Sequence, residues 1–198
     1  ENITWTVAGT VTNVKIQYST DSGSTWPVGK VISDSFSAAA GSFPWTIPND
    51  ISSTVKVKVS DTTDPNLSDT SDVDFKIKGR LKVTTPNGAN TYVVGTSEVI
   101  SWEKFGTLGD ITIKYSTDGT NYPNTIATVP ASDLNKTWTP IPNTPTTNAK
   151  VKIELATDPD GVFDTSDNVF AIKGKLTLSS PNGGQTFFVG GSTSIDWS

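Results

Sequence analysis

The chain has 198 residues and is acidic, with 20 Asp and Glu against 15 Lys and Arg. This balance argues against a nucleic-acid-binding protein, which needs a basic face, and the lack of His and Cys excludes His-based triads, thiol catalysis and zinc sites of the usual kind. No run of about 18 apolar residues occurs, so no membrane insertion is predicted.

The first part of the chain, residues 1–79, alternates apolar and polar residues with a period of two. Residues 55–59 (VKVKV), for example, place valines on one face of a strand and lysines on the other. This alternation is typical of β-strands packed on one side against a core. Turn sequences such as the one at 21–23 (DSG) separate the alternating runs.

The second part, residues 80–174, is predicted to form about seven strands. They are expected near 80–85, 91–94, 97–103, 110–116, 124–129, 136–140 together with 149–156, and 168–173. Closely spaced strands separated by turns favour an antiparallel sandwich or barrel. Its interior is expected to hold Trp102, Tyr115, Trp138, Ile153 and Phe170.

The chain repeats itself with a period of about 95 residues, which is the size of a whole domain rather than of a solenoid or propeller unit. The shared motifs are IxW at 3–5, 100–102 and 195–197, YSTD at 18–21 and 115–118, DTSD at 69–72 and 164–167, and IKG at 77–79 and 172–174. Three segments follow from this register. Residues 1–79 are a repeat lacking its first strand, 80–174 a complete repeat, and 175–198 the opening strands of a following repeat.

The segment 175–198 is expected to complete the body of a repeat equivalent to 1–79. Two routes are open: the polypeptide continues into that repeat, or the segment is donated to a neighbouring subunit. Residues 193–198 duplicate the positions of residues 1–6, which favours a continuing polypeptide. Both routes predict neighbouring repeats, or copies of the chain, joined head to tail in a linear assembly.

Four motifs in fixed order carry a resemblance to a known family. They are the run at 179–197 (SSPNGGQTFFVGGSTSIDW), the run at 14–26 (VKIQYSTDSGSTW), a WxxP segment at 45–48, and the closing DTSDxxFxIKG. The sequence resembles the Ig-like repeats of secreted and cell-surface microbial proteins. It is similar to the N-terminal Ig-like domain of the fungal Ser/Thr-rich, GPI-anchored cell-wall-assembly family.

The resemblance implies tandem Ig-like (fibronectin-like) antiparallel β-sandwiches at the extracellular surface of a microbe. It implies a structural array that forms a stalk, fibre or surface filament, and it carries over no catalytic, cofactor-binding or metal-binding residue. We therefore expect no enzyme activity and no cofactor. The alternative is an adhesive or carbohydrate-binding surface module, with contacts to cell wall or glycan.

Residues 19–26 (STDSGSTW) match the Asp-box of sialidase-like propellers. Propeller blades recur at about 40–50 residues, roughly half the period found here. An Asp-box is also a turn device, in which the carboxylate accepts backbone N–H groups and glycine takes a positive φ. The structural interpretation is therefore preferred to a glycosidase site.

Two Asp-rich segments are the best candidates for a bound ion, because oxygen ligands in a turn suit Ca²⁺. They contain Asp158, Asp160, Asp164 and Asp167 in one repeat and Asp61, Asp64, Asp69 and Asp72 in the other. Asp-rich surface loops are also common without any ion, so no metal ligand is assigned.

Other motifs have an ordinary structural explanation. Trp5, between Ile3 and Val7 on one strand face, is expected in the core, whereas one of the adjacent Phe187 and Phe188 must face outward. Sequons for N-glycosylation begin at Asn2, Asn66 and Asn135 and matter only in a host that glycosylates.

Overall fold

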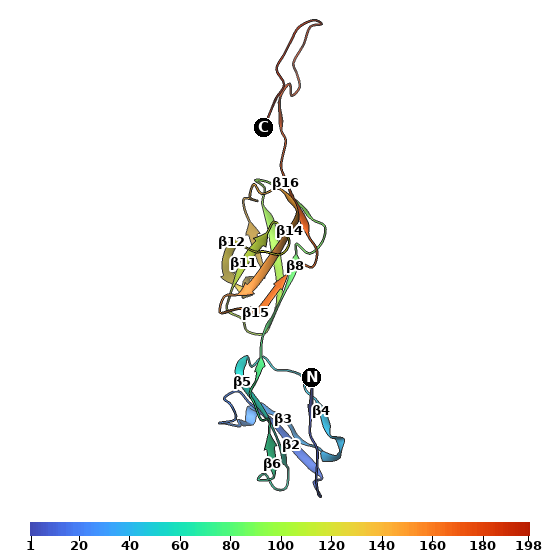
Figure 1. The fold of residues 1–198 in the computed structure, drawn as a ribbon, viewed down its shortest axis with the longest axis vertical. Coiled ribbons are helices and arrows are strands. Elements are labelled where there is room, and N and C mark those ends of the chain that lie inside the picture. The colour runs from blue at the N-terminus through green and yellow to red at the C-terminus, as the bar shows by residue number, and fades with distance from the viewer. The chain divides into compact units, whose positions relative to one another are not determined.

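The computed structural model describes residues 1–198 and consists of β-strands, three short 3-10 helices and no α-helix (Figure 1). Chain contacts divide it into two compact units, Glu1–Arg80 with Phe105–Thr107, and Leu81–Lys104 with Leu108–Ser198. We call residues 1–79 repeat 1, residues 80–174 repeat 2 and residues 175–198 the C-terminal segment. No helix is long and apolar enough to cross a bilayer.

Repeat 1 forms two antiparallel sheets. Its strands are β1 (Asn2–Thr4), β2 (Asn13–Ser19), β3 (Val31–Ser37), β4 (Ser42–Pro44), β5 (Ser52–Asp61), β6 (Ser68–Thr70) and β7 (Phe75–Ile77), with 3-10 helices η1 (Val28–Lys30) and η2 (Ala38–Ala40). One sheet is the pair β1–β4, and the other has the order β3-β2-β5-β6 with β7 also on β5. The register is set by pairs such as Tyr18 with Val57.

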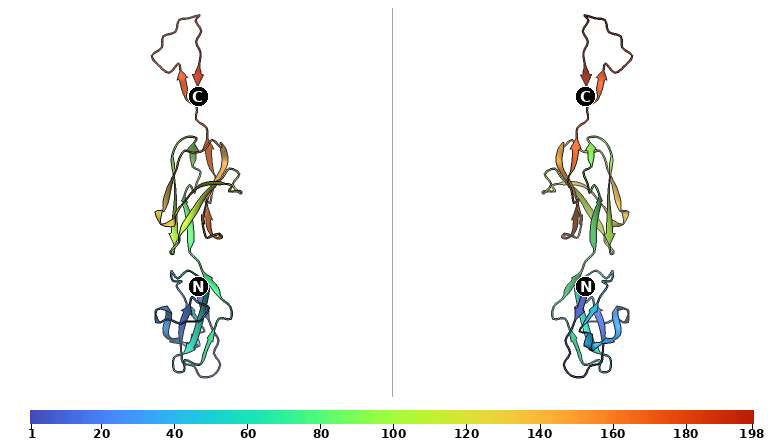
Figure 2. Two further views of the ribbon diagram at one scale, coloured as in Figure 1. Left: turned by 90° about the vertical axis from the view of Figure 1, so that its left-hand side faces the viewer. Right: turned by 90° about the vertical axis from the view of Figure 1, so that its right-hand side faces the viewer.

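Repeat 2 has the same plan with two more strands. They are β8 (Arg80–Thr85), β9 (Thr91–Val93), β10 (Glu98–Phe105), β11 (Asp110–Ser116), β12 (Asn124–Pro130), β13 (Asn135–Trp138), β14 (Thr146–Leu155), β15 (Asp158–Thr165) and β16 (Phe170–Lys173), with 3-10 helix η3 (Ala131–Asp133). The sheet β13-β10-β8 faces the sheet β12-β11-β14-β16-β9, to which β15 is attached through β14 (Figure 2). Strand β9 pairs with β16 in parallel, and the other pairings described are antiparallel.

The repeat register gives each strand of repeat 1 a counterpart. Strands β1 and β4 match β10 and β13, and β2, β3, β5, β6 and β7 match β11, β12, β14, β15 and β16. No strand of repeat 1 corresponds to β8 or β9. Both repeats are thus Ig-like, fibronectin-like β-sandwiches. The sheet β1–β4 of repeat 1 is smaller than the corresponding sheet β13-β10-β8 of repeat 2.

The core of repeat 2 lies between its two sheets, and the alternation of the strands produces it. Ile111 and Ile113 on β11 have no exposed surface, while Thr112 between them faces outward. The five side chains expected inside are all buried: Trp102, Tyr115, Trp138, Ile153 and Phe170. The predicted interior of this repeat is therefore confirmed.

The core of repeat 1 is smaller but uses the same aromatic side chains. Trp45 lies 5.5 Å from Tyr18 and 6.1 Å from Phe75, measured between ring centroids. In repeat 2, the matching Trp138 lies 4.9 Å from Tyr115 and 6.4 Å from Phe170. Each sandwich is thus built around one Tyr–Trp–Phe trio.

Trp5 is partly buried, while its counterpart Trp102 is only 3% exposed. Both indoles donate to a backbone carbonyl, that of Ala38 in repeat 1 and Ala131 in repeat 2, at 2.9 Å. Val7, expected on the same strand face as Trp5, is 40% exposed because β1 ends at Thr4. The difference in Trp burial follows from the absence of a β8 counterpart in repeat 1.

The strand prediction for repeat 2 was wrong at two places. Residues 136–140 and 149–156 belong to separate strands, β13 and β14, in different sheets. Residues 158–165 form strand β15, although an acidic loop was expected there. Of the β15 side chains only Val162 is buried, so the apolar alternation that reveals the other strands is missing.

In the C-terminal segment, β17 (Leu178–Ser180) pairs with β18 (Asp196–Trp197). The side chains of the C-terminal segment are exposed except for Ser180 and Pro181, which are partly buried. Phe187 and Phe188 are 55% and 83% exposed, so both face outward. The segment has no hydrophobic core of its own.

Candidate functional site

The Asp-box of repeat 1 closes the turn after β2. The Asp21 carboxylate accepts hydrogen bonds from the Ser19 hydroxyl, from the Thr25 hydroxyl at 2.6 Å and from the Thr25 backbone N–H at 2.9 Å. These donors, Ser19 first, lower the pKa of Asp21 to about 2. Gly23 has a φ of +81°, and a Cβ there would lie 3.3 Å from the Trp26 ring.

Asp118 performs the same task in repeat 2. It accepts bonds from the side chain and backbone N–H of Asn121, both at 2.8 Å, from the Thr120 N–H at 2.9 Å and from the Ser116 hydroxyl at 2.8 Å. These donors, those of Asn121 first, hold the pKa of this carboxyl well below its usual range. Both carboxylates therefore accept hydrogen bonds within their own turns, an arrangement that organises the backbone.

The Asp-rich segment of repeat 2 connects strand β15 to the chain around β8. The Asp164 carboxylate accepts the Val83 backbone N–H at 2.7 Å. The Asp167 carboxylate accepts the Asn87 side-chain amide at 2.8 Å, and the Asp167 N–H donates to the Asn87 Oδ1. No group of three or more acidic side chains in the chain lies close enough to hold a metal ion.

In repeat 1, the matching carboxylates are those of Asp69 and Asp72. They accept no bond of this kind, because repeat 1 has no counterpart of β8 or of the turn that follows it. Asp69 is exposed on β6 and lines a groove in the surface of the repeat. The sequence motif DTSD is thus shared, whereas the contacts of its aspartates differ between the repeats.

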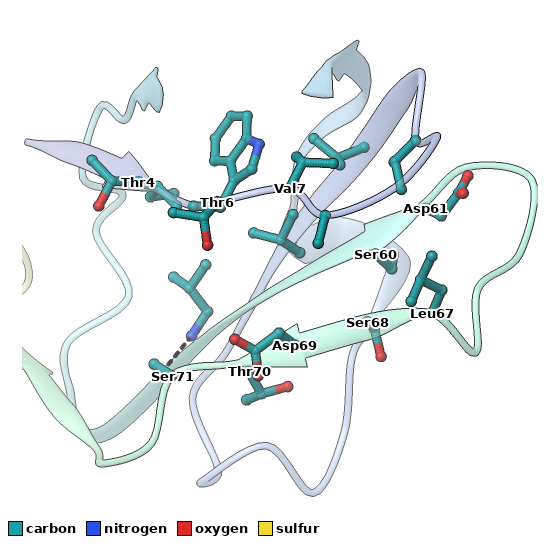
Figure 3. Close-up of a pocket in the computed structure, with 17 residues that line it drawn as sticks. Thr4, Thr6, Val7, Ser60, Asp61, Leu67, Ser68, Asp69, Thr70 and Ser71 are labelled. Atoms are coloured by element: carbon teal, nitrogen blue, oxygen red, sulfur yellow. Dashed lines mark hydrogen bonds between the residues drawn. The ribbon is translucent and has the colours of Figure 1, made fainter. Parts of the chain in front are cut away.

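The groove has a volume of about 610 Å³. Figure 3 shows it between the Thr4–Val7 segment and strand β6, with Asp69 and Ser71 on the β6 side. Apolar side chains from the core line much of it: Ile3, Trp5, Val11, Val14, Val57 and Val59. In repeat 2 the corresponding place is taken by β8, whose Leu81 and Val83 are 3% and 1% exposed.

Two matching lysines lie over aromatic rings on the outer faces of the sandwiches. The Lys58 ammonium lies 4.5 Å from the centre of the Trp26 ring, and that of Lys152 lies 4.6 Å from the Phe163 ring. Such cation–π contacts occupy one face of each ring. A sugar that stacks on either ring would therefore have to use the opposite face.

Glu154 is the one buried acidic side chain of the β14 outer face. It is 5% exposed and makes ion pairs of 2.6 Å with both Lys114 and Lys152. Burial by itself would raise the pKa of this carboxyl, but hydrogen bonds and charge from the two lysines outweigh it, and the pKa lies below its usual value. Glu154 is thus held as a carboxylate in a structural cluster.

A second cluster joins Tyr18, Lys30 and Asp50 in repeat 1. The Tyr18 hydroxyl donates to Asp50 at 2.6 Å, and Lys30 pairs with the same oxygen at 2.7 Å. Burial, and then the Asp50 carboxylate, raise the pKa of Tyr18 to about 12. Hydrogen bonds from Lys30 and Tyr18 lower the pKa of Asp50, so Tyr18 stays protonated and Asp50 ionised at neutral pH.

The three sequon asparagines, Asn2, Asn66 and Asn135, are all exposed. Sequence reasoning identified these positions, the turn carboxylates and the buried tryptophans. It placed Asp164 and Asp167 in a loop and missed their bonds to Val83 and Asn87. The available signal was that the PNG and DTSD motifs both recur with the repeat period of about 95 residues.

Comparison with known proteins gives structural matches but no match by sequence. No protein-family model matches the chain, and a search of curated proteins found no match. Among solved structures, the chain is similar to the fibronectin(III)-like modules of Clostridium thermocellum CbhA. The identity is 15%, the TM-score is 0.35, and the alignment covers 87% of this chain and 85% of the other. The fold is defined by the strand pairings described above, and this likeness carries no functional conclusion.

Proposed function

We propose that the chain is a structural part of an extracellular array of Ig-like repeats, which serves as a stalk, fibre or surface filament. The observation that carries the proposal is the use of the aromatic side chains that the repeats share. Trp45 and Trp138 are 8% and 5% exposed, and each lies between a Tyr and a Phe ring. The repeated motif therefore serves to build a sandwich, which is what a spacer needs from every unit.

The junctions between repeats support the same function. The last strand of each repeat leads into the next segment through the sequences at 77–81 (IKGRL) and 172–176 (IKGKL), each with a single glycine. Neither junction contains the Ser/Gly-rich or Pro-rich stretch of a long linker. The two junctions have the same length in the sequence repeat, which would let every unit of an array add the same increment of length.

The acidic groups with lowered pKa values fit a structural role better than a catalytic one. A general acid needs a carboxyl whose pKa is raised toward neutrality. The pKa values of Asp21, Asp118 and Glu154 are instead lowered, by turn donors or by lysines. We therefore propose that the chain is not an enzyme and needs no cofactor.

The second candidate function is an adhesive or carbohydrate-binding module. Trp26 favours it, because this side chain is only partly buried beside the turn formed by Asp21. The Lys58 ammonium over its ring argues against it. The location at a microbial surface or cell wall rests on the resemblance of the four motifs to Ig-like repeats of such proteins.

Small-angle X-ray scattering of the full chain at low concentration tests whether the chain serves as a spacer. The expected profile is that of a stiff rod with a narrow distribution of end-to-end distances. A profile that requires a broad ensemble of relative repeat orientations would contradict the proposal. Retention on immobilised cell-wall polysaccharides that is lost in Trp26→Ala, but not in Trp197→Ala, would favour the adhesive function instead.

A further inference from the structure

A pocket of about 680 Å³ opens at one side of the sandwich of repeat 2. It lies between β12 and β13, which are edge strands of the two facing sheets. Tyr115 and Trp138, which are 7% and 5% exposed, contribute to its lining from the core. Ligand-binding pockets have volumes of about 300–1,000 Å³. All the lining residues belong to repeat 2, so the pocket is formed within one sandwich.

In repeat 1 the corresponding side of the sandwich carries the 3-10 helix η1. Its Lys30 places the ammonium 5.0 Å from the centre of the Tyr18 ring and pairs with Asp50 at 2.7 Å. Tyr18 is the counterpart of Tyr115 in the repeat register. Repeat 2 has no helix at this point, because Pro123 leads directly into β12. The lysine of η1 therefore covers the tyrosine ring that lines the pocket in repeat 2.

A buried hydroxyl without a partner marks the same difference between the repeats. In the register of the matched strands β5 and β14, Thr144 takes the position of Asp50. The Asp50 carboxylate accepts hydrogen bonds from Tyr18 and Lys30, whereas the Thr144 Oγ1 is buried and has no hydrogen-bond partner. Repeat 2 thus lacks the carboxylate that holds a cation at this place in repeat 1.

The one charged residue of the pocket lining is Lys136 on β13. It lies opposite Ile100, just as Phe43 lies opposite Ile3 in repeat 1, so Lys136 takes the inward-facing position of Phe43. Ile100 has no exposed surface, and Phe43 packs against the core of repeat 1. Lys136 is partly buried and makes no ion pair. A partly buried ammonium without a counter-ion favours an anionic ligand.

The uncharged part of the lining has the chemistry that a sugar ring needs. Thr125 and Thr137 present hydroxyl groups from the two opposite edges, and both residues are exposed. Pro140 and Pro142 present ring surfaces, which can pack against the C–H face of a sugar. A few polar groups set in an apolar lining fix the orientation of a ligand.

We propose that this pocket binds an acidic sugar unit of an extracellular polysaccharide. The Lys136 ammonium pairs with the carboxylate of the sugar, the hydroxyls of Thr125 and Thr137 bond to its ring hydroxyls, and the two prolines contact its C–H face. The site goes beyond the spacer function, and the choice of a polysaccharide as the ligand rests on the proposed extracellular location. Each copy of the pocket would let the array hold polysaccharide along its length.

Nuclear magnetic resonance of the ¹⁵N-labelled full chain provides the first test, with trigalacturonate as the probe. Titration should shift the indole N–H signal of Trp138 and leave that of Trp45, its counterpart in repeat 1, in place. The methyl ester of trigalacturonate, in which the carboxylates are neutral, should bind about tenfold more weakly or worse, because it cannot form the charge-assisted hydrogen bond.

Substitution of the lysine provides the second test. Lys136→Gln should weaken binding of trigalacturonate about tenfold and leave binding of the methyl ester nearly unchanged. Lys82→Gln is the matched control, because it removes the same charge from an exposed position of β8 outside the pocket lining, and it should change binding little. The melting temperatures of both variants verify that the sandwich is folded.

An unchanged Trp138 signal at millimolar trigalacturonate would overturn the site. So would equal binding of the acid and its ester, or equal effects of Lys136→Gln and Lys82→Gln. Binding of triglutamate as tight as that of trigalacturonate would identify an acidic peptide as the ligand and overturn the sugar. None of these results bears on the scattering profile of the chain, so failure of the sugar site is distinguishable from failure of the spacer.

Discussion

At the residue scale, the tryptophans of this chain have different roles despite their shared motifs. Trp102 and Trp197 both belong to an IxW motif, yet the first is 3% and the second 67% exposed. The difference comes from neighbouring strands, because Trp102 has both sheets of repeat 2 around it. Side chains at the same position of a shared motif therefore differ in their contribution to stability.

Replacement of Trp102 by Ala should destabilise repeat 2 by about 3–5 kcal/mol, as truncation of a core aromatic does. The loss includes the indole hydrogen bond to Ala131. Trp197→Ala is the control and should change the free energy of unfolding by no more than about 0.5 kcal/mol. Urea unfolding followed by fluorescence measures both, and equal effects of the two substitutions would contradict the core assignment.

Asp118 should stabilise its turn only while it is ionised. Its folded-state pKa is lowered, so its contribution is complete above the pKa of the unfolded chain, about 4, and is lost as pH falls through the lower folded-state pKa. Asp118→Ala should lower the melting temperature by several degrees at pH 7, and the deficit should shrink as the pH approaches 2. Calorimetry at pH 7, 4 and 2 checks this, and a deficit independent of pH would argue against the turn carboxylate.

At the element scale, the attachment of β8 to repeat 2 depends on more than its apolar side chains. The Asp164 carboxylate on β15 receives the Val83 N–H, and Asp167 holds the turn that follows β8 through Asn87. Strand β15, which pairs with β14, thus holds β8 through an acidic side chain. The carboxylates of Asp164 and Asp167 accept hydrogen bonds from the backbone of β8 and from the turn that follows it.

Removal of the Asp164 carboxylate should therefore loosen β8. Asp164→Ala leaves the partly buried Val83 N–H without its acceptor and should cost about 1–3 kcal/mol. Asp160→Ala, at an exposed position of the same strand, should cost less than about 0.5 kcal/mol. Amide hydrogen exchange at Val83 provides the specific readout: exchange should quicken in Asp164→Ala and stay unchanged in Asp160→Ala.

Sequence patterns predicted most strands of repeat 2 because their buried positions alternate. Strand β11, with Ile111, Ile113 and Tyr115 inward, lies at the expected residues 110–116. Strand β15 could not be found this way, since its backbone pairs with β14 while its side chains stay mostly exposed. The lack of an opening strand in residues 1–79 was expected from the repeat register, whereas the contacts of Asp164 and Asp167 with Val83 and Asn87 became visible only in the structure.

At the scale of the whole molecule, stability is spread over separate sandwiches without disulfides. The core of repeat 2 includes residues contributed by β8 and β9, such as Leu81 and Tyr92. Repeat 1 has no such contributions, and its groove leaves part of the core lining accessible. The core of repeat 1 is therefore less completely covered than that of repeat 2.

Chelation of calcium should leave the melting temperature of the full chain nearly unchanged. Stabilisation by a bound ion grows with its concentration relative to the dissociation constant, and Asp164 and Asp167 are already engaged with Val83 and Asn87. Differential scanning calorimetry with and without excess chelator measures the effect. A large fall on chelation would instead identify Asp158, Asp160 and Asp164 as ligands.

The pair of hydrogen bonds between Asn87 and Asp167 also affects where the protein undergoes deamidation. Asn87 and Asn182 each precede a glycine, the arrangement in which the following backbone nitrogen most readily attacks the side-chain amide and releases ammonia. Asn87 is held by bonds at both its Nδ2 and its Oδ1, whereas Asn182 is exposed. Peptide mapping after prolonged storage should therefore find isoaspartate mainly at position 182.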